Sequence, residues 1–334
     1  MPQEMIAAVE EEILKAIQSL NKKITHNYFE MVDYQFGISK RQKYIKNRGK
    51  MLRPLILLLC STNTNSHITW KNAVPAAAAV ELLHNFSLVH DDIQDNSPTR
   101  RNRPTVWKEW GIPQAINAGD GLFSMANISI GNLSTHFEGE LVVQIMKVFN
   151  KTCLDLTRGQ FMDIAFEEIE NISLEQYWTM IEYKTARLIS ASAEIGAILS
   201  GNENEVIMDF RKFGLNLGLA YQIEDDILGI WGSEGKTGKS VTMDLETSKK
   251  TLPVVYGLNN SPKFAKRWYK GNITKEESIS LSNQLKIDGA LEYSQNHVIN
   301  LTDKALIILN KLPLPANYKQ VLFDLSTSLL DRET

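Results

Sequence analysis

The chain has 334 residues and a formal net charge of −3, with 22% of its residues charged. This balance argues against a polyelectrolyte that binds nucleic acid or an anionic membrane by bulk attraction. The longest uninterrupted apolar runs, 55–60 and 76–80, are far too short to span a bilayer. With 43% hydrophobic residues, the chain is long enough for two average domains or one large one.

The N-terminal segment and the cysteines indicate a cellular compartment. Residues 1–20 are amphipathic and acidic, which differs from a secretory signal or a transit peptide. The two cysteines, Cys60 and Cys153, lack metal-binding spacing and are typical of core thiols in a reducing compartment. We therefore expect a cytoplasmic enzyme or binding protein with no transmembrane segment and no nucleic-acid partner.

Apolar positions recur with helical spacing along almost the whole chain. One stripe contains Val80, Leu83, His84, Leu88 and Asp91, which share one face of a helix. Alternating strand patterns are scarce, and neither an internal repeat nor an interdomain linker is visible. We predict a single all-α domain over residues 1–334, with helices at 4–22, 50–61, 71–95, 112–134, 139–170, 173–200, 203–231, 248–258, 288–311 and 315–331.

Two acidic clusters lie at the ends of long apolar stretches that we predict to be buried helices. The first acidic cluster contains Asp91, Asp92 and Asp95, and the second contains Asp225 and Asp226. Burying an uncompensated carboxylate costs several kcal/mol, and like charges on one helix face repel. Oxygen ligands without nearby His or Cys favour Mg²⁺, whose sites usually include substrate phosphates. The pattern predicts a diphosphate held by magnesium between two helices.

Basic residues accompany both clusters. Lys50 and Arg53 share a face at the start of a predicted helix, which suits an anionic group but equally describes a solvated basic turn. Arg100 and Arg101 follow the first acidic cluster, either as phosphate ligands or as surface partners of the acids. His84 precedes Asp91 by two helical turns, and a lone histidine there is more often a core side chain than a ligand.

The second half of the chain supplies further polar candidates. Lys184 and Thr185 lie in a helix of small and apolar residues, and Gln222 shares the face of the second acidic cluster. Cations recur at Lys239 and Lys249. The Gly232–Ser240 segment superficially resembles a nucleotide-binding P-loop, but its spacing is wrong and it follows a helix, so we reject that interpretation.

Together these motifs resemble the trans-isoprenyl diphosphate synthases, the head-to-tail prenyltransferases. The resemblance runs from about residue 45 to the C-terminus and implies a large helical bundle of the isoprenoid synthase type. Its central cavity is expected between the helices that bear the two aspartate motifs. The motifs in chain order are Gly49-Lys50-x-x-Arg53-Pro54, Asp91-Asp92-x-x-Asp95, Arg100-Arg101-x-x-Pro104-Thr105, Gly159-Gln160-x-x-Asp163, Lys184-Thr185 and Gln222-x-x-Asp225-Asp226.

The resemblance also implies residue roles. The expected Mg²⁺ ligands, for three ions per active site, are Asp91, Asp92, Asp95, Asp225 and Asp226. The expected ligands of isopentenyl diphosphate are Lys50, Arg53, His84 and Arg101, and those of the allylic diphosphate are Arg100, Lys184, Thr185, Gln222, Lys239 and Lys249. Asp91, Asp92, Asp95, Arg100, Lys184 and Asp225 are expected to be catalytic.

The chain departs from the family pattern at two positions. Asn102 stands where the family usually has Gly after the paired arginines, and Asn tolerates the left-handed backbone that such a turn needs. Gly229 stands where the second acidic motif commonly has a third Asp, which we expect to loosen one water-mediated metal contact.

The implied reaction is ionisation of an allylic diphosphate, attack by isopentenyl diphosphate and loss of a proton. Phe86 and Ser87, five and four residues before Asp91, are arranged as in geranylgeranyl (C20) rather than farnesyl (C15) synthases, although Phe86 also fits a plain core residue. A farnesyl diphosphate synthase, a terpene cyclase and a non-catalytic regulatory subunit are the alternatives. A homodimer is expected from the family alone.

Overall fold

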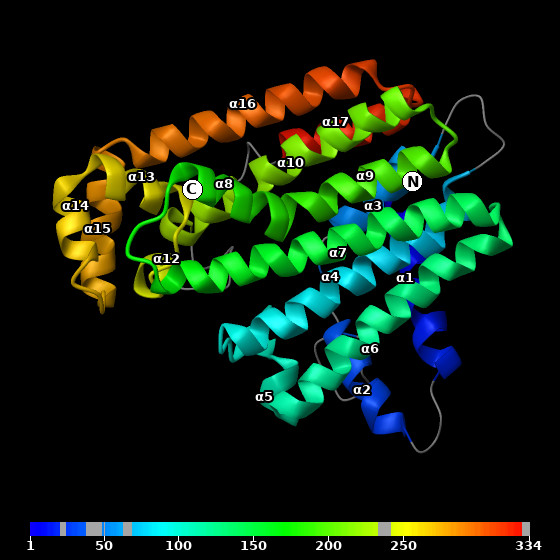
Figure 1. Ribbon diagram of the computed structural model, residues 1–334, viewed down its shortest axis with the longest axis horizontal. Helices are drawn as coiled ribbons and strands as arrows, with labels where there is room; N and C mark the ends of the chain where they lie inside the picture. Colours follow the sequence, from blue (N-terminus) through cyan, green and yellow to red (C-terminus); the bar gives the residue numbers. More distant parts are fainter. Residues whose placement is uncertain (21–24, 38–48, 50, 63–68, 233–241, 329–334) are drawn as a thin grey trace. The chain divides into compact units, whose positions relative to one another are not determined.

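The segments with helical periodicity form helices along almost the whole described chain in the computed structural model (Figure 1). The structure describes residues 1–20, 25–37, 49, 51–62, 69–232 and 242–328. The predicted all-α class is confirmed, and two two-residue strands are the extended elements of these ranges. Within them, no helix combines the length and hydropathy needed to cross a bilayer. Two of the predicted site residues, Lys50 and Lys239, lie outside the described residues.

The described chain forms two compact units. The first unit contains residues 1–150, 192–207 and 313–315, and the second contains 151–191, 208–312 and 316–334. The elements that lie in the first unit are α1 (Pro2–Leu20), α2 (His26–Gln35), α3 (Leu52–Cys60), η2 (Trp70–Ala73), α4 (Val74–Gln94), β1 (Thr99–Arg100), β2 (Arg103–Pro104), α5 (Val106–Trp110), α6 (Ile112–Gly131) and η3 (Asn132–Thr135).

Three helices pass from one unit to the other along the chain. They are α7 (Gly139–Glu168), α9 (Arg187–Leu199) and α10 (Asn204–Trp231). The remaining elements lie in the second unit: α8 (Leu174–Ile181), η4 (Glu182–Ala186), α12 (Met243–Glu246), α13 (Leu252–Asn260), α14 (Pro262–Trp268), α15 (Lys275–Ile287), α16 (Ala290–Lys311) and α17 (Ala316–Thr327).

Helix α4 is the centre of the first unit, where it packs along α6 and also contacts α1 and α3 (Figure 1). Its N-terminal half carries small side chains, and Ala76 to Val80 are fully buried. Gly119 of α6 permits close approach, because a Cβ atom there would lie 2.2 Å from His90 Nε2. Small residues at this interface therefore bring the C-terminal end of α4 against α6.

In the second unit, α10 carries the buried residues Phe210, Phe213 and Leu217. Gly218 lies directly against η4, since a Cβ atom there would be 2.7 Å from the Cα atom of Ala186. A separate cluster, which includes Val254, Phe264 and Leu285, packs α13, α14 and α15 together. These contacts fix the segments on both sides of the second acidic cluster.

The structure differs from the predicted elements in two ways. The helix predicted at 173–200 is interrupted by the π-helical turn η4, so it is observed as α8, η4 and α9. Several short elements were not predicted, namely α2, α5, α12, α14, α15 and the β1–β2 pair. Most of these elements span too few turns for hydrophobic periodicity to reveal them.

Candidate active site

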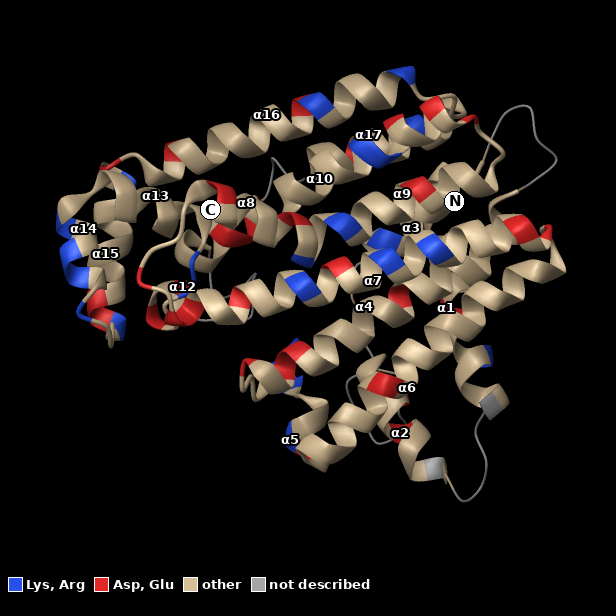
Figure 2. Ribbon diagram, viewed as in Figure 1, with Lys and Arg blue, Asp and Glu red and all other residues tan. Residues whose placement is uncertain are grey.

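The first acidic cluster lies at the C-terminal end of α4, where Asp95 is the C-cap residue. The negative end of the helix dipole makes this a poor place for carboxylates unless a cation is close. Arg100 supplies one: its Nε donates to Asp92 Oδ1 at 2.8 Å and its Nη2 to Asp91 Oδ2 at 3.2 Å. Figure 2 shows acidic and basic ribbon segments close together at one end of α4. Burial raises the pKa of Asp92 to about 6, and the charge of Arg100 opposes the rise.

A short hairpin presents this arginine. Strands β1 and β2 are antiparallel and joined by Arg101 and Asn102, with φ angles of 53° and 60°. Two consecutive left-handed residues are characteristic of a type I′ turn, so Asn102 occupies the conformation that its side chain tolerates. Arg103 anchors the hairpin to α2, because it donates to the backbone oxygens of Tyr34 at 2.5 Å and Gln35 at 2.6 Å.

Arg53 and His84 lie together, with 3.3 Å between Arg53 Nη1 and His84 Nε2. Since a guanidinium only donates, the imidazole accepts at Nε2 and carries its proton at Nδ1. Burial lowers the pKa of His84 well below its usual range, and the charge of Arg53 acts in the same direction. His84 is therefore a neutral acceptor that orients a cation.

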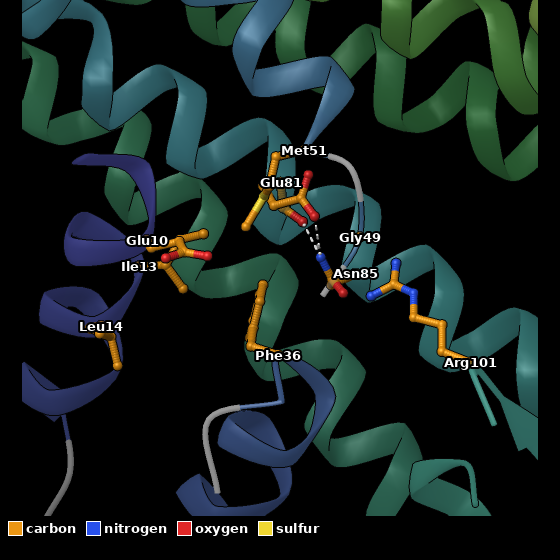
Figure 3. A pocket seen from close by; sticks show the side chains of 9 residues that line it. All are labelled: Glu10, Ile13, Leu14, Phe36, Gly49, Met51, Glu81, Asn85 and Arg101. Atoms are coloured by element: carbon orange, nitrogen blue, oxygen red, sulfur yellow. Dashed lines mark hydrogen bonds between the residues drawn. The ribbon is translucent and has the colours of Figure 1, made fainter. Parts of the chain in front are cut away.

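A small hollow lies in the first unit, lined in part by Glu81 and Asn85 of α4 (Figure 3). Its volume is about 20 Å³, enough for roughly one water molecule. Glu81 and Asn85 of α4 point into it, and Asn85 Nδ2 donates to Glu81 Oε1 at 2.9 Å. Gly49 lies close to Arg101, since a Cβ atom there would be 2.6 Å from Arg101 Nη2. The lining residues are Glu10, Ile13, Leu14, Phe36, Gly49, Met51, Glu81, Asn85 and Arg101.

Glu81, which is only 4% exposed, belongs to none of the sequence motifs. The signal was present, because Glu81 interrupts an otherwise apolar run on α4 between Ala76 and Leu83. A single glutamate in such a run needs compensation once the helix is buried. Its pKa is raised by burial, while the charges of Arg53 and Arg101 lower it.

The two members of the second acidic cluster differ in environment. Asp225 is half-buried, whereas Asp226 is only 5% exposed. Asp226 accepts hydrogen bonds from the Tyr177 hydroxyl (2.7 Å), the Leu252 backbone N–H (2.9 Å) and Gln222 Nε2 (2.8 Å). Burial raises the pKa of Asp226 to about 7, and these hydrogen bonds oppose the rise.

The π-helical turn η4 carries the predicted pair Lys184 and Thr185. Lys184 Nζ lies 2.5 Å from Asp163 Oδ2, which also lies 3.8 Å from Lys249 Nζ. The Thr185 hydroxyl donates to Gln222 Oε1 at 2.6 Å. The structure therefore joins four predicted polar residues of the second unit, and adds Asp163 as the anion that holds both lysines.

Glycine at two positions makes room for polar groups. A Cβ atom on Gly159 would lie 2.2 Å from the backbone nitrogen of Lys184, so α7 touches η4 directly. A Cβ atom on Gly229 would lie 1.9 Å from Asp244 Oδ2. The space where the family commonly places a third aspartate side chain is thus filled by the carboxylate of Asp244 from α12.

The donor set of the first acidic cluster fits magnesium. Its oxygens are hard ligands, and they already accept a cationic partner, Arg100. Among the described residues, no three or more acidic, His or Cys side chains are grouped closely enough to hold an ion alone. Mg²⁺ is commonly bound by one or two carboxylates together with substrate phosphates. Asp91 and Asp92 are therefore the residues of this cluster that could hold it together with a substrate phosphate.

Comparison with known proteins agrees with these features. The Polyprenyl synthetase family matches residues 38–284. The chain is 36% identical over 270 residues to a geranylgeranyl diphosphate synthase of Saccharolobus solfataricus, covering 80% of this chain and 81% of that one. It is 30% identical to a (2E,6E)-farnesyl diphosphate synthase of Mycobacterium bovis, covering 98% and 93%.

The fold agrees as well. A crystal structure of geranylgeranyl pyrophosphate synthetase from Pyrococcus horikoshii Ot3 matches with a TM-score of 0.89 and 32% sequence identity. The match covers 99% of this chain and 97% of that one. The predicted fold of the isoprenoid synthase type is confirmed by this likeness.

Glu81 gives a test of buried charge in the first unit. A carboxyl with a raised pKa contributes stability that is present below its unfolded pKa and lost as pH rises through its folded pKa. Glutamine keeps the acceptor for Asn85 but cannot titrate. We therefore expect the free energy of unfolding of the native chain to fall, relative to Glu81→Gln, as pH rises from about 4.5. Urea unfolding at a series of pH values measures this difference.

Glu11 provides a control of opposite sign. It is exposed on α1 and its hydrogen bond with Lys15 lowers its pKa. The native chain should therefore gain stability relative to Glu11→Gln as pH rises through the acidic range. A Glu81→Gln difference that is flat with pH, or that follows the Glu11→Gln trend, would contradict the assignment.

Proposed function

Because this chain belongs to the polyprenyl synthetase family, we propose that it condenses isopentenyl diphosphate with allylic diphosphates to geranylgeranyl diphosphate (C20). It is a short-chain trans-prenyltransferase of the geranylgeranyl and farnesyl diphosphate synthase type. The observation that carries the proposal is the polar set beside the second acidic cluster: Lys184 pairs with Asp163, and the neighbouring Thr185 donates to Gln222, which in turn donates to Asp226.

Each acidic cluster is proposed to bind Mg²⁺, with three ions per active site. Asp91, Asp92 and Asp95 are the proposed ligands of the first cluster, and Asp225 is the proposed direct ligand of the second. Bound Mg²⁺ would neutralise the negative charge that develops on a departing diphosphate. In its absence, Arg100 holds the first cluster, and we propose that this arginine turns to the allylic diphosphate when metal is bound.

The chain's own cations orient the two substrates in this proposal. Lys184, Thr185, Gln222, Lys239 and Lys249 are assigned to the allylic diphosphate, and Lys50, Arg53, His84 and Arg101 to isopentenyl diphosphate. The geometry supports His84 as an orienting group, since it accepts from Arg53 and stays neutral. Fixed donors of this kind stabilise charge that develops in the transition state without reorganising. No side-chain nucleophile is needed.

Two buried thiols favour a reducing environment. Cys60 and Cys153 are both unpaired. Burial raises the pKa of each, that of Cys153 to about 11, so both stay protonated and unreactive. We propose that the enzyme acts in the cytoplasm.

Incubation of the purified chain with isopentenyl diphosphate tests the activity. Each reaction contains Mg²⁺ and one primer, either the C5, C10 or C15 allylic diphosphate, and the dephosphorylated alcohols are separated by chromatography. We expect C20 alcohol as the main product and no turnover after a chelator removes Mg²⁺. Asp91→Asn and Asp225→Asn are each expected to lower kcat by at least about tenfold, because both clusters are required. Turnover that survives the chelator would refute the metal assignment.

Phe86 is proposed to set the product length. It lies about 7.5 Å before Asp91 along the helix axis. Its ring packs against Phe123 of α6, with 5.5 Å between centroids, and against His90, with 4.8 Å. Ser87 is small, and its hydroxyl donates to the backbone oxygen of His84 at 2.7 Å. Because these two rings hold the Phe86 ring in place, the ring can block a growing prenyl tail at a fixed distance from the first acidic cluster. Farnesyl diphosphate is the alternative, in view of the relative from Mycobacterium bovis.

Replacing Phe86 by alanine is expected to lengthen the main product beyond C20, because the tail can then pass the position of the ring. Chromatography of the dephosphorylated alcohols measures the change. Phe323→Ala, at an exposed position of α17, is the matched control and should leave the product unchanged. An unaltered product from Phe86→Ala would mean that this ring is only a core residue.

Homodimerisation is proposed from exposed apolar residues. Val143, Leu154 and Phe161 follow one another on one face of α7, and Phe161 is 72% exposed. Exposed apolar faces of this kind are typical of protein interfaces. We expect the native chain to sediment as a dimer and Phe161→Glu as a monomer or a weakened dimer. Phe323→Glu on α17 is the control and should stay dimeric. A native chain that sediments as a monomer would refute the proposal.

A further inference from the structure

Asp226 is held from three directions within the second unit. The donors are the Tyr177 hydroxyl of α8, the Leu252 N–H at the start of α13 and Gln222 Nε2 of α10. Tyr177 is fully buried and Asp226 is 5% exposed. Oδ2 accepts two of these bonds and Oδ1 the third, so at most one lone-pair direction of Oδ1 is left for any other partner.

This arrangement differs from that of a metal ligand. A ligating carboxylate must turn an oxygen toward the ion, and neighbouring Asp225, which is half-buried, can do so. Both oxygens of Asp226 instead accept hydrogen bonds from the three donors named above. If the carboxylate turned toward a metal ion, these buried donors would lose their partner, which proteins strongly avoid.

Two segments with proposed allylic-diphosphate ligands contact this carboxylate, and a third reaches it through Gln222. Gln222 donates to Asp226 and accepts from Thr185, so the orientation of its amide is fixed. Leu252 follows Lys249 by three residues, and its N–H is one of the donors that a helix N-terminus leaves without a helical partner. Binding that N–H fixes the chain on which Lys249 lies.

We infer that Asp226 is a positioning residue, which aligns Gln222, Thr185 and the Lys249 segment for the allylic diphosphate, and that Asp225 is the metal ligand of the pair. The inference rests on the proposed function for the identity of the ligand. It differs from the expectation, implied by the family resemblance, that Asp226 is itself a Mg²⁺ ligand. Tyr177, which belongs to no sequence motif, helps to hold the Asp226 carboxylate in place through its hydroxyl.

Excess metal separates the two roles. A weakened metal ligand is compensated by more Mg²⁺, whereas a misaligned diphosphate site is not. The experiment is calorimetric titration of inorganic diphosphate into the native chain, Asp225→Asn, Asp226→Asn and Tyr177→Phe, at a low Mg²⁺ concentration and at one about tenfold higher. We expect Asp226→Asn to weaken diphosphate binding by at least about tenfold at both concentrations. The asparagine NH₂ group would take the place of one carboxylate oxygen and could not accept the hydrogen bond that this oxygen accepts in the native chain. Added Mg²⁺ should restore binding to Asp225→Asn.

Tyr177→Phe keeps the test decisive if Asp226→Asn does not fold. It removes one donor and leaves the carboxylate, so diphosphate binding should weaken by a smaller factor, equally at both Mg²⁺ concentrations. Asp209→Asn, an exposed carboxylate on the same helix, is the matched control and should bind as the native chain does. Rescue of Asp226→Asn by Mg²⁺, or native binding by Tyr177→Phe, would overturn the inference.

Turnover adds a second readout that a purely structural defect does not give. Both Asp226→Asn and Tyr177→Phe should raise KM for the allylic diphosphate and leave KM for isopentenyl diphosphate within about twofold. Equal increases of both KM values would count against the inference. A native chain that binds diphosphate but condenses no prenyl substrates would refute the proposed function and leave this inference standing.

Discussion

Burial of carboxylates on apolar helices is the constraint on which the candidate site depends. Glu81 and Asp92 on α4 and Asp226 on α10 are each at most 5% exposed. An ionised carboxylate removed from water loses several kcal/mol unless charges or hydrogen bonds replace its hydration. The chain supplies a guanidinium for Asp92, an amide for Glu81, and a hydroxyl, an amide and a backbone N–H for Asp226. Asn85 lies on the same helix as Glu81, whereas Arg100, Tyr177 and Leu252 come from other elements. Asp92 and Asp226 therefore each fix a neighbouring segment as well.

The fixed segments are those that carry the candidate ligands. Asp92 holds the hairpin through Arg100, and the backbone contacts of Arg103 hold the same hairpin against α2. Asp226 holds the start of α13, and through Gln222 it reaches Thr185 in the π-helical turn. A π-turn widens the helix locally and is frequent at functional sites. Here Gly159 and Gly218 accommodate it, because side chains at either position would overlap its backbone.

The sequence predicted the helical class and the long helices because their periodicity extends over many turns, as on α4 and α10. Motifs also singled out Asp91, Asp92, Arg53 and His84, and the structure places the two aspartates against Arg100 and places Arg53 against His84. It could not reveal Tyr177 or Asp244, since their roles come from contacts with residues far away in the chain. Nor could it show that Asp226 is buried and accepts three hydrogen bonds while Asp225 is half-buried, because adjacent residues of a helix point in different directions and their surroundings come from other parts of the chain.

The first acidic cluster is compensated by a charged guanidinium, whereas Asp226 is compensated by neutral hydrogen-bond donors. This difference decides how easily a metal ion could take the place of the partner. The Arg100 side chain is 30% exposed, and its charge offsets both the first acidic cluster and the negative end of the α4 dipole. A divalent metal ion would supply at least as much positive charge, so the acids would stay compensated if it took the place of the guanidinium. The donors around Asp226 are neutral and largely buried, and removing them would leave buried hydrogen-bonding groups without partners. Replacing the partner of an acid by a metal ion would therefore cost less at the first cluster than at Asp226, although both are aspartates on an apolar helix.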